Sequence, residues 1–376
     1  MSAEESNPSS DGAARRRPRY GGTHPRRFED RYKELDPETF PEMQEHVRAQ
    51  GRTPAGTHVP VLLAEVMDKL APRPGEVIVD ATVGFGGHSV VFLERVGSEG
   101  RLIGLDLDAE QLRLTAERWA GHLKLGAKAI QEEPGVWRLG AQICLRPMHF
   151  AGVGKALAAE GLSACDVLFA DLGVSSMQLD DPARGFSYKE DGPLDMRMSA
   201  TLRQTAGGIL EAISEEELAG ALDRFADEPD HMAIARRIVK RRKSAPLKRT
   251  KDLLRLVFEA KGIDYRDWRK KRQEGDASLH PAARTFQAIR ILVNDELRGL
   301  EQFLRVAPYC LRPGGRIGII SFHSGEHERV VQALQSGMES GLYAADALEP
   351  VRPGTGELAS NPRSRSALFH WARRLP

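Results

Sequence analysis

Hydrophobic positions in the first half of the chain occur in short continuous runs. Runs without alternation are typical of strands that are buried on both faces of a parallel sheet. Such strands are predicted at residues 77–81, 102–105, 142–145 and 167–171. Helical spacing is found at 89–96 and 109–120, whereas 124–139 fits neither period and is interpreted as an extended loop. Strands that alternate with helices predict a doubly wound α/β sheet, which binds ligands beyond the carboxyl ends of its strands.

After about residue 184 the apolar positions take helical spacing. Ser214 and Glu217 form a capping box before a first helix, and a strongly basic second helix is predicted from His231. Thr250 is expected to cap a third helix. Because no strand is expected in this stretch, the pattern predicts an all-helical domain inserted into the α/β domain.

The chain returns to the sheet after this insertion. One long helix is predicted over 284–307, and strands are predicted at 316–322 and 367–372. The patterns together predict four parts: a tail at 1–55, the first part of a Rossmann-like domain at 56–184, the inserted helical domain at 185–282 and the second part of the Rossmann-like domain at 283–376.

The first 55 residues are polar, rich in arginine and interrupted by proline. This composition predicts a disordered basic tail. A mitochondrial transit peptide is a weaker alternative, because Glu4, Glu5 and Asp11 depart from the acid-poor pattern of such peptides. A third hypothesis is that the tail adds non-specific affinity for RNA.

Composition narrows the class of protein. The chain has 376 residues, enough for more than one domain, and its 54 Lys and Arg nearly balance 53 Asp and Glu. Three cysteines without a C-x-x-C pair argue against a disulfide scaffold and a cysteine-rich zinc site. No apolar run approaches the ~18 residues of a membrane span. We expect a cytoplasmic protein without membrane or DNA partners.

The glycine-rich turn after the first predicted strand indicates a cofactor. The glycines that allow a tight turn and a close backbone approach are Gly84, Gly86 and Gly87. Asp106 ends the second strand, where a ribose-binding acid belongs. Ser89 stands where a dinucleotide fingerprint has its third glycine, which favours S-adenosylmethionine (SAM) over NAD or FAD. Asp80 is a candidate partner for the cationic end of SAM, and a turn without any ligand is the remaining alternative.

Several blocks of sequence match one known pattern. The most distinctive lies after the fourth predicted strand, at 171–181 and 184–198; taken alone, it also fits an ordinary turn-rich connection with solvated acids. The other blocks are 57–63, 84–88, 284–290, 321–324 and 361–366. Over about residues 56–372 the chain resembles the bacterial 16S rRNA (cytosine-N4)-methyltransferase family, of the small-subunit methyltransferase H or MraW type.

The resemblance implies a SAM-dependent domain with a helical insertion. It implies methylation of the exocyclic N4 amine of a decoding-centre cytidine in 16S (small-subunit) rRNA, either free or in an assembled small subunit. It also implies SAM contacts at Gly86, Gly87, His88, Asp106, Phe150, Asp171 and Gln178. His88 has an alternative role as a helix N-cap residue and Phe150 as a core residue.

Asp171 is the candidate catalytic residue. The lone pair of the cytidine amine is delocalised into the ring, so the site must align the amine and accept hydrogen bonds from it. A carboxylate at a strand end can accept such a bond and help remove the proton. His323 and His327 have the four-residue spacing of metal ligands, but no third ligand accompanies them and we expect no metal.

The sequence departs from the family pattern in three places. They are the long tail, the extra length before the third strand, and the stretch 324–327, where the family usually has a leucine and an acid pair. The last of these slightly weakens a catalytic role for that loop.

The predicted helical insertion carries a basic band, which we define by Arg236, Arg237, Lys240, Arg241, Arg242, Lys243, Lys248, Arg249 and Lys251. A run of charged residues is more often a solvated helix face. This run contains no acidic residue, however, and that favours contact with RNA. Two other functions stay open. They are a SAM methyltransferase with another acceptor, and an RNA-binding ribosome assembly factor with a relic cofactor fold.

Overall fold

A computed structural model of the protein describes residues 60–122, 128–276, 278–344 and 349–376. The predictions for the tail at 1–55 lie outside these residues. Within them, none of the helices has both the length and the apolar character needed to cross a membrane.

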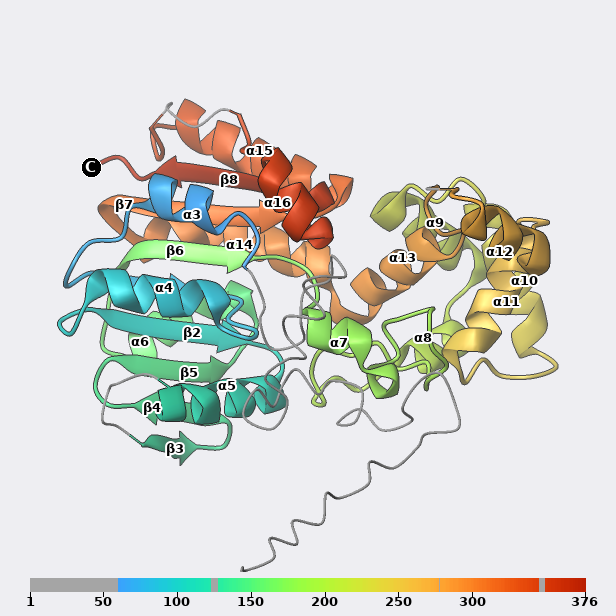
Figure 1. The fold of residues 1–376 in the computed structure, drawn as a ribbon, viewed down its shortest axis with the longest axis horizontal. Coiled ribbons are helices and arrows are strands. Elements are labelled where there is room, and N and C mark those ends of the chain that lie inside the picture. Colours follow the sequence, from blue (N-terminus) through green and yellow to red (C-terminus); the bar gives the residue numbers. More distant parts are fainter. Residues whose placement is uncertain (1–59, 123–127, 277, 345–348) are drawn as a thin grey trace, which may run out of the picture.

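An eight-stranded sheet forms the larger part of the molecule (Figure 1), in the order β3-β4-β5-β2-β1-β6-β7-β8. The strands are β1 (Val77–Asp80), β2 (Arg101–Asp106), β3 (Ala129–Glu133), β4 (Val136–Leu139), β5 (Ile143–Pro147), β6 (Cys165–Asp171), β7 (Leu311–Ser321) and β8 (Leu368–Arg373). The five strands from β5 to β7 are parallel. They confirm the predicted α/β class. The strand order reverses between β1 and β6, and this switch point is where such sheets bind their ligands.

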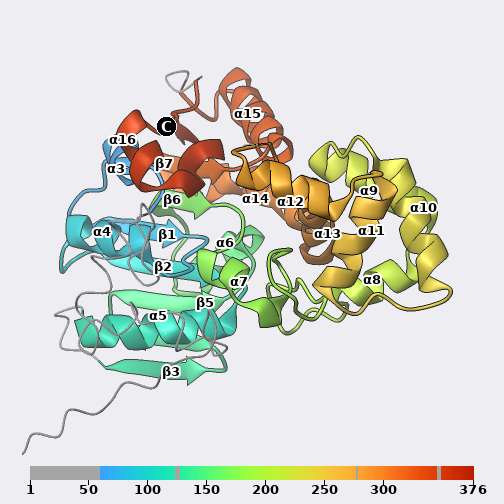
Figure 2. The same cartoon turned by 45° about the vertical axis from the view of Figure 1, so that its right-hand side comes forward.

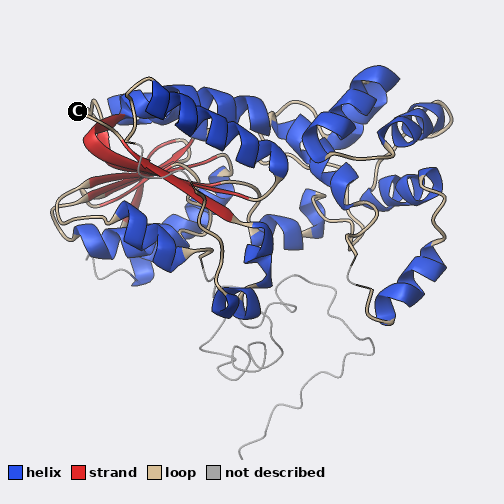
Figure 3. Cartoon of the chain, turned by 90° about the horizontal axis from the view of Figure 1, so that it is seen from above, coloured by secondary structure: helices blue, strands red, loops and turns tan. Residues whose placement is uncertain are grey.

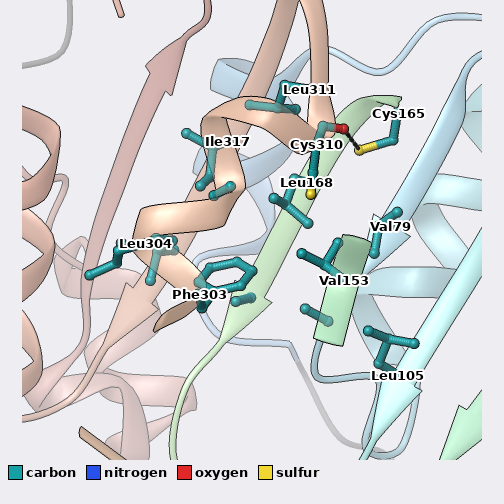
Figure 4. Close-up of a cluster of buried hydrophobic side chains, with 14 of the residues drawn as sticks. Val79, Leu105, Val153, Cys165, Leu168, Phe303, Leu304, Cys310, Leu311 and Ile317 are labelled. Carbon is teal, nitrogen blue, oxygen red and sulfur yellow. Dashed lines mark hydrogen bonds between the residues drawn. The ribbon is translucent and has the colours of Figure 1, made fainter. Parts of the chain in front are cut away.

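Helices cover both faces of the sheet (Figure 3). One face packs against α3 (Leu63–Leu70), α4 (Gly87–Val96) and α5 (Ala109–His122), and the other against α6 (Val153–Ala159), α14 (Glu296–Cys310) and α15 (Ser324–Glu339). The side chains of β1 alternate between these two cores, with Val77 and Val79 in one and Ile78 in the other. Figure 4 shows Phe303 and Leu304 of α14 beside Leu168 of β6. Burial on both faces explains the continuous apolar runs.

A second group of helices lies to one side of the sheet (Figures 1 and 2). It contains α8 (Ala206–Ala212), α9 (Glu215–Ala226), α10 (His231–Arg242), α11 (Thr250–Ala260), α12 (Tyr265–Gln273) and α13 (Ala283–Asn294). These helices share a hydrophobic core of their own, which includes Leu222, Ile238 and Val257. That core also takes in Phe286 and Ile289 of α13, beyond the predicted limit at residue 282. The exact domain limits stay a prediction.

Short elements lie in the segments between the strands and the longer helices. They are the 3₁₀ helices η2 (Phe150–Gly152), η3 (Pro182–Arg184) and η4 (Pro362–Ser366) and the α-helices α7 (Ser176–Asp180) and α16 (Thr355–Ser360). α7 begins with a capping box in which the Ser175 side chain accepts from the Gln178 amide. The loop after β6 is therefore locally ordered.

The expectation of an extended loop at 124–139 is wrong for the described part of that stretch. β3 and β4 pair as an antiparallel hairpin around Gly135, whose φ of 78° suits a tight turn. β3 is an edge strand whose side chains are mostly exposed, so it lacks the apolar pattern by which the inner strands were recognised. The sheet is consequently mixed, because β4 also runs antiparallel to β5 and β8 to β7.

Two predictions about helices are also corrected. The single helix expected over 284–307 is divided into α13 and α14 at Asp295, which has a φ of 52°. Asn294, just before this break, bonds the Met198 amide and the Met196 carbonyl, so the helix end is fixed to the loop after β6. Thr250 does not cap α11, because its hydroxyl donates to the Glu190 carbonyl and accepts from the Gly192 amide.

Candidate functional site

Three carboxylates meet at the carboxyl ends of neighbouring strands. Asp80 ends β1, Asp106 ends β2 and Asp171 ends β6. Their negative charges act on one another: Asp106 raises the pKa of Asp80, and Asp80 raises that of Asp171, each in addition to a larger effect of burial. The structure thus brings together the strand-end acids that the sequence singled out.

Asp80 holds the glycine-rich turn in place. Its carboxylate accepts from the Ser89 hydroxyl at 2.5 Å and from the Thr82 amide at 3.1 Å, and the residue is only 1% exposed. Burial raises its pKa to about 6. Both carboxylate oxygens bond groups of the chain itself, and Asp80 thereby fixes α4 on β1. Ser89, which replaces the third glycine of the dinucleotide fingerprint, is the residue that makes this link. The role of Asp80 in holding the cationic end of SAM stays a prediction.

Packing against neighbouring side chains explains why two positions of the turn are glycine. Gly86 has a φ of 75°, and a Cβ built on it would lie 2.2 Å from the Trp119 ring of α5. A Cβ on Gly87 would lie 2.7 Å from Pro60. Neighbouring side chains therefore require both glycines, independently of any ligand. Contact of their backbone with SAM stays a proposal.

Asp106 links the turn to the next loop. Its carboxylate accepts from the Gly84 amide at 2.8 Å and from the Asp108 amide at 2.9 Å. Burial, opposed by these hydrogen bonds, raises its pKa to about 6. Two acceptor oxygens held in this way suit a pair of vicinal hydroxyls.

Asp108 joins the loop after β2 to the loop after β6. Its carboxylate accepts from Arg184 Nη1 at 2.6 Å and from Gln178 Nε2 at 3.2 Å. Arg184 also donates to the carbonyls of Arg197 and Met198. Gln178 and Arg184 thereby lock the block 171–198 onto the site, and Asp108 is a site residue that the sequence analysis missed. Its position two residues after Asp106 was the available signal.

Asp171 has a carboxylate that is only partly used. Oδ1 is buried without a hydrogen-bond partner among the described residues, while Oδ2 lies 3.8 Å from Nδ1 of His88. Burial and the charges of Asp80 and Glu326 raise the pKa of Asp171 well above its usual value. A buried oxygen that lacks a partner is costly unless a ligand supplies a donor.

His88 and Phe150 are two further residues for which the sequence predicts contact with SAM. His88 is not the N-cap of α4, which is Gly86; its Nε2 instead lies 2.9 Å from the Val61 carbonyl. Phe150 is half-buried in η2, and its ring is 4.1 Å from His149 and 5.7 Å from Phe303. Phe150 therefore packs on the core as the alternative interpretation expected, and a role in SAM binding stays a proposal.

His323 is a further buried group near Asp171. It follows β7, the strand that pairs with β6, and both of its ring nitrogens are buried without a hydrogen bond among the described residues. Its Nε2 lies 3.2 Å from Oε1 of Glu326. Burial raises the pKa of Glu326, but contacts with His323, the Phe322 amide and Arg290 outweigh that effect and hold the pKa below its usual value.

His327 faces away from this group. Its Nδ1 lies 3.2 Å from Nε2 of His370, which also contacts the Ser321 hydroxyl. His323 and His327 therefore have different partners. In the described parts of the chain, no three His, Cys, Asp or Glu side chains are grouped as metal ligands would be.

The basic band divides into two sets. Five of its cations make contacts within the chain, where Arg236 pairs with Glu215, Arg237 with Glu259, Arg249 with Asp191, and Arg242 and Lys251 bond backbone carbonyls. The other four are exposed and make no side-chain hydrogen bond or ion pair with the residues that the structure describes; we call Lys240, Arg241, Lys243 and Lys248 the free set. Contact of the band with RNA stays a prediction.

Comparison with known proteins finds one family for this sequence. The family model described as the MraW methylase family matches residues 55–375. A relative from Alkaliphilus metalliredigens, named ribosomal RNA small subunit methyltransferase H 2, is 37% identical over 358 residues, 95% of this chain and 97% of its own. A relative from Sorangium cellulosum, named ribosomal RNA small subunit methyltransferase H, is 40% identical over 318 residues, 85% of this chain and 91% of its own.

Proposed function

Because this chain belongs to the MraW methylase family, we propose that it transfers a methyl group from SAM to the exocyclic N4 amine of a decoding-centre cytidine in 16S rRNA. The observation that carries this proposal is the buried carboxylate oxygen of Asp171 at the switch point of the sheet, which has no hydrogen-bond partner among the residues that the structure describes. The names of the relatives support small-subunit rRNA as the substrate. The site of action would be the cytoplasm, on the rRNA or on an assembled small subunit.

The residues around the switch point fit SAM. Asp106 would accept from the ribose hydroxyls, and the turn at Gly86, Gly87 and His88 would lie along the cofactor. Gln178 and Asp108 would close the site from the side of the loop after β6. SAM supplies an electrophilic methyl group on a sulfonium, so the protein must bring an acceptor nitrogen to it in line.

Asp171 is proposed as the acceptor of a hydrogen bond from the amine. The amine loses a proton when the new nitrogen–carbon bond forms, and an ionised carboxylate beside it stabilises the positive charge that develops. The raised pKa of Asp171 brings its basicity closer to that of a useful proton acceptor than an ordinary aspartate would be.

His323 is proposed to assist from the adjacent strand. The Glu326 carboxylate, 3.2 Å from Nε2, favours the tautomer with its hydrogen on that nitrogen. Nδ1 is then left as an acceptor, which suits an amine or a water that carries the proton away. Both Asp171 and His323 would thus orient the base through acceptor atoms that have no hydrogen bond to the described part of the chain.

The decisive experiment follows methylation in the cell and in the purified system. Mass spectrometry of rRNA nucleosides from cells lacking this gene should show loss of N4-methylated cytidine, and the purified chain with SAM should restore it on isolated small subunits or rRNA. Unchanged nucleosides together with no transfer in vitro would reject the proposal.

The two alternatives predict different results. An enzyme with another acceptor would leave rRNA unmodified but methylate a protein or metabolite in the same assay. An assembly factor with a relic fold would bind RNA but give no heat on titration with SAM.

A further inference from the structure

The helix α12 carries the highest density of positive charge in the helical part of the molecule. Five of its nine residues are cations, namely Arg266, Arg269, Lys270, Lys271 and Arg272, against one acid, Asp267. All five are exposed. Only Arg272 makes side-chain hydrogen bonds within the described residues, to the carbonyls of Asp276 and Ser278. The other four have no such bond and no ion pair with the part of the chain that the structure describes.

This helix is poorly supported by its own sequence. It buries no residue fully, and Arg266 lies three and four positions before Arg269 and Lys270, a spacing at which like charges repel on a helix surface. Asp264 caps its first turn through the amides of Arg266 and Asp267. A short helix with self-repelling charge gains stability when an extended anion neutralises it.

The aromatic side of α12 is already in use. Trp268 packs edge to face on Phe258 of α11 at 5.5 Å and on His280 at 4.5 Å. Binding to a membrane surface would require a free apolar face in addition to the cations. Because the indole is directed into the fold, the charged face is the one available to a partner.

The positive surface continues toward the loop after β6. The His280 ring stacks on Tyr188 at 4.1 Å, and Tyr188 belongs to the block 184–198 that is tied to the site. In addition to burial, the charges of Arg272, Lys251 and Lys189 lower the pKa of His280, to about 4. The end of α12 and the exposed Lys189 therefore lie on the same side as the loop that leads to Asp171.

We propose that the exposed cations of α12 form an RNA-contacting surface that binds backbone phosphates of the substrate, in addition to the basic band at 236–251. This inference rests on the proposed function, since it assumes that the substrate is RNA. Phosphate contacts from Lys and Arg fix the position of a nucleic acid without reading its sequence. The α12 surface would thus hold RNA that flanks the target while the loop after β6 presents the base.

The test uses the full chain with Arg266→Gln, Arg269→Gln, Lys270→Gln and Lys271→Gln combined. Binding to a small-subunit rRNA transcript is measured at several salt concentrations. The affinity should fall by about tenfold or more at low salt, and the slope of log K against log salt should become shallower by about three. Affinity for SAM, which reports the folded site, should not change.

A matched control removes the same charge elsewhere. The control variant carries four substitutions at exposed positions of the sheet part, namely Arg95→Gln, Lys155→Gln, Arg305→Gln and Arg352→Gln. Its slope of log K against log salt should stay near that of the wild type. Equal losses in both variants would mean that net charge alone matters and would overturn the proposal. So would wild-type RNA affinity in the α12 variant, or a loss confined to binding of anionic phospholipid vesicles.

The result is separable from the proposed function. Should the unmodified protein fail to bind rRNA or to methylate it, the proposed function itself is rejected. Should the unmodified protein succeed and the α12 variant match it in RNA affinity and salt slope, only the role of α12 is rejected.

Discussion

At the residue scale, Asp171 combines two properties that oppose each other in a folded protein. Its carboxylate is placed where an acceptor is useful, yet one oxygen is buried with no donor from the described residues. Its raised pKa reports the cost of the ionised form in this position. The site therefore keeps an unsatisfied charge that a bound substrate would satisfy.

Asp171→Asn is expected to separate activity from stability. Methyl transfer should fall about 10²–10⁴-fold, because the amide is a poor acceptor for the amine proton. A raised pKa means that the folded state is most stable, relative to the unfolded state, when Asp171 is protonated at low pH. That stability is lost as the pH rises through the folded pKa, so at pH 7 the ionised carboxylate destabilises the fold, and Asn removes this cost. The melting temperature of the variant should therefore equal or exceed that of the wild type at pH 7. Wild-type turnover, or a large loss of stability, would contradict this assignment.

Asp106 is expected to make SAM binding dependent on pH. Its pKa of about 6, against an ordinary 3.8, means that it takes up a proton as the pH falls through about 6. One oxygen then stops accepting, and the affinity for SAM should weaken by about tenfold between pH 7 and pH 5. Calorimetry across this range measures the effect, and Asp106→Asn should show weak binding at every pH. A pH-independent wild type, or a fall that persists in the variant, would contradict the assignment.

Site residues could be predicted from the sequence where their place at the end of a strand decides their role. Asp80, Asp106 and Asp171 each end an apolar run, so the sequence placed them at one edge of the sheet. The role of Asp80 in fixing α4 was not predictable, since it depends on the Ser89 hydroxyl reaching it across the turn. His323 was considered only as a metal ligand, because the pairing of β7 with β6 is needed to bring it near Asp171.

At the scale of elements, the turn between β1 and α4 depends on α5. Gly86→Ala should lower the free energy of unfolding by about 2–5 kcal/mol, because the new Cβ meets the Trp119 ring and the positive φ is strained. Urea denaturation measures the change. Gly121→Ala in α5 is the matched control; its Cβ has nothing within 4 Å, and the substitution should be neutral or slightly stabilising. Equal stability of both variants would contradict this account of the turn.

Elements whose residues are buried were the predictable ones. The inner strands and α9 to α11 carry apolar periods that follow from their cores. The β3–β4 hairpin escaped recognition because β3 is an exposed edge strand. The break between α13 and α14 was not predicted, because the helical spacing of apolar residues continues past Asp295. The helix end is fixed by hydrogen bonds from Asn294 to the loop at 196–198, which the sequence does not show.

At the scale of the whole molecule, the division of the basic band gives a further prediction. Neutralising the free set, Lys240, Arg241, Lys243 and Lys248, should weaken RNA binding and flatten its dependence on salt. Neutralising Arg236, Arg237 and Arg249, which face acids of the chain, should have a smaller effect per charge, because RNA must compete with those acids. Equal effects per charge, measured by salt titration of RNA affinity, would contradict the distinction.

The place of the helices between β6 and β7 also has a consequence for synthesis on the ribosome. These two strands are neighbours in the sheet, yet residues 172–310 separate them in the chain. At translation rates of roughly 5–20 residues per second, a nascent β6 waits on the order of 10 s for its partner. During that interval its edge is open to association with other nascent chains. Early folding of the intervening helices, which have a core of their own, would keep the waiting polypeptide compact.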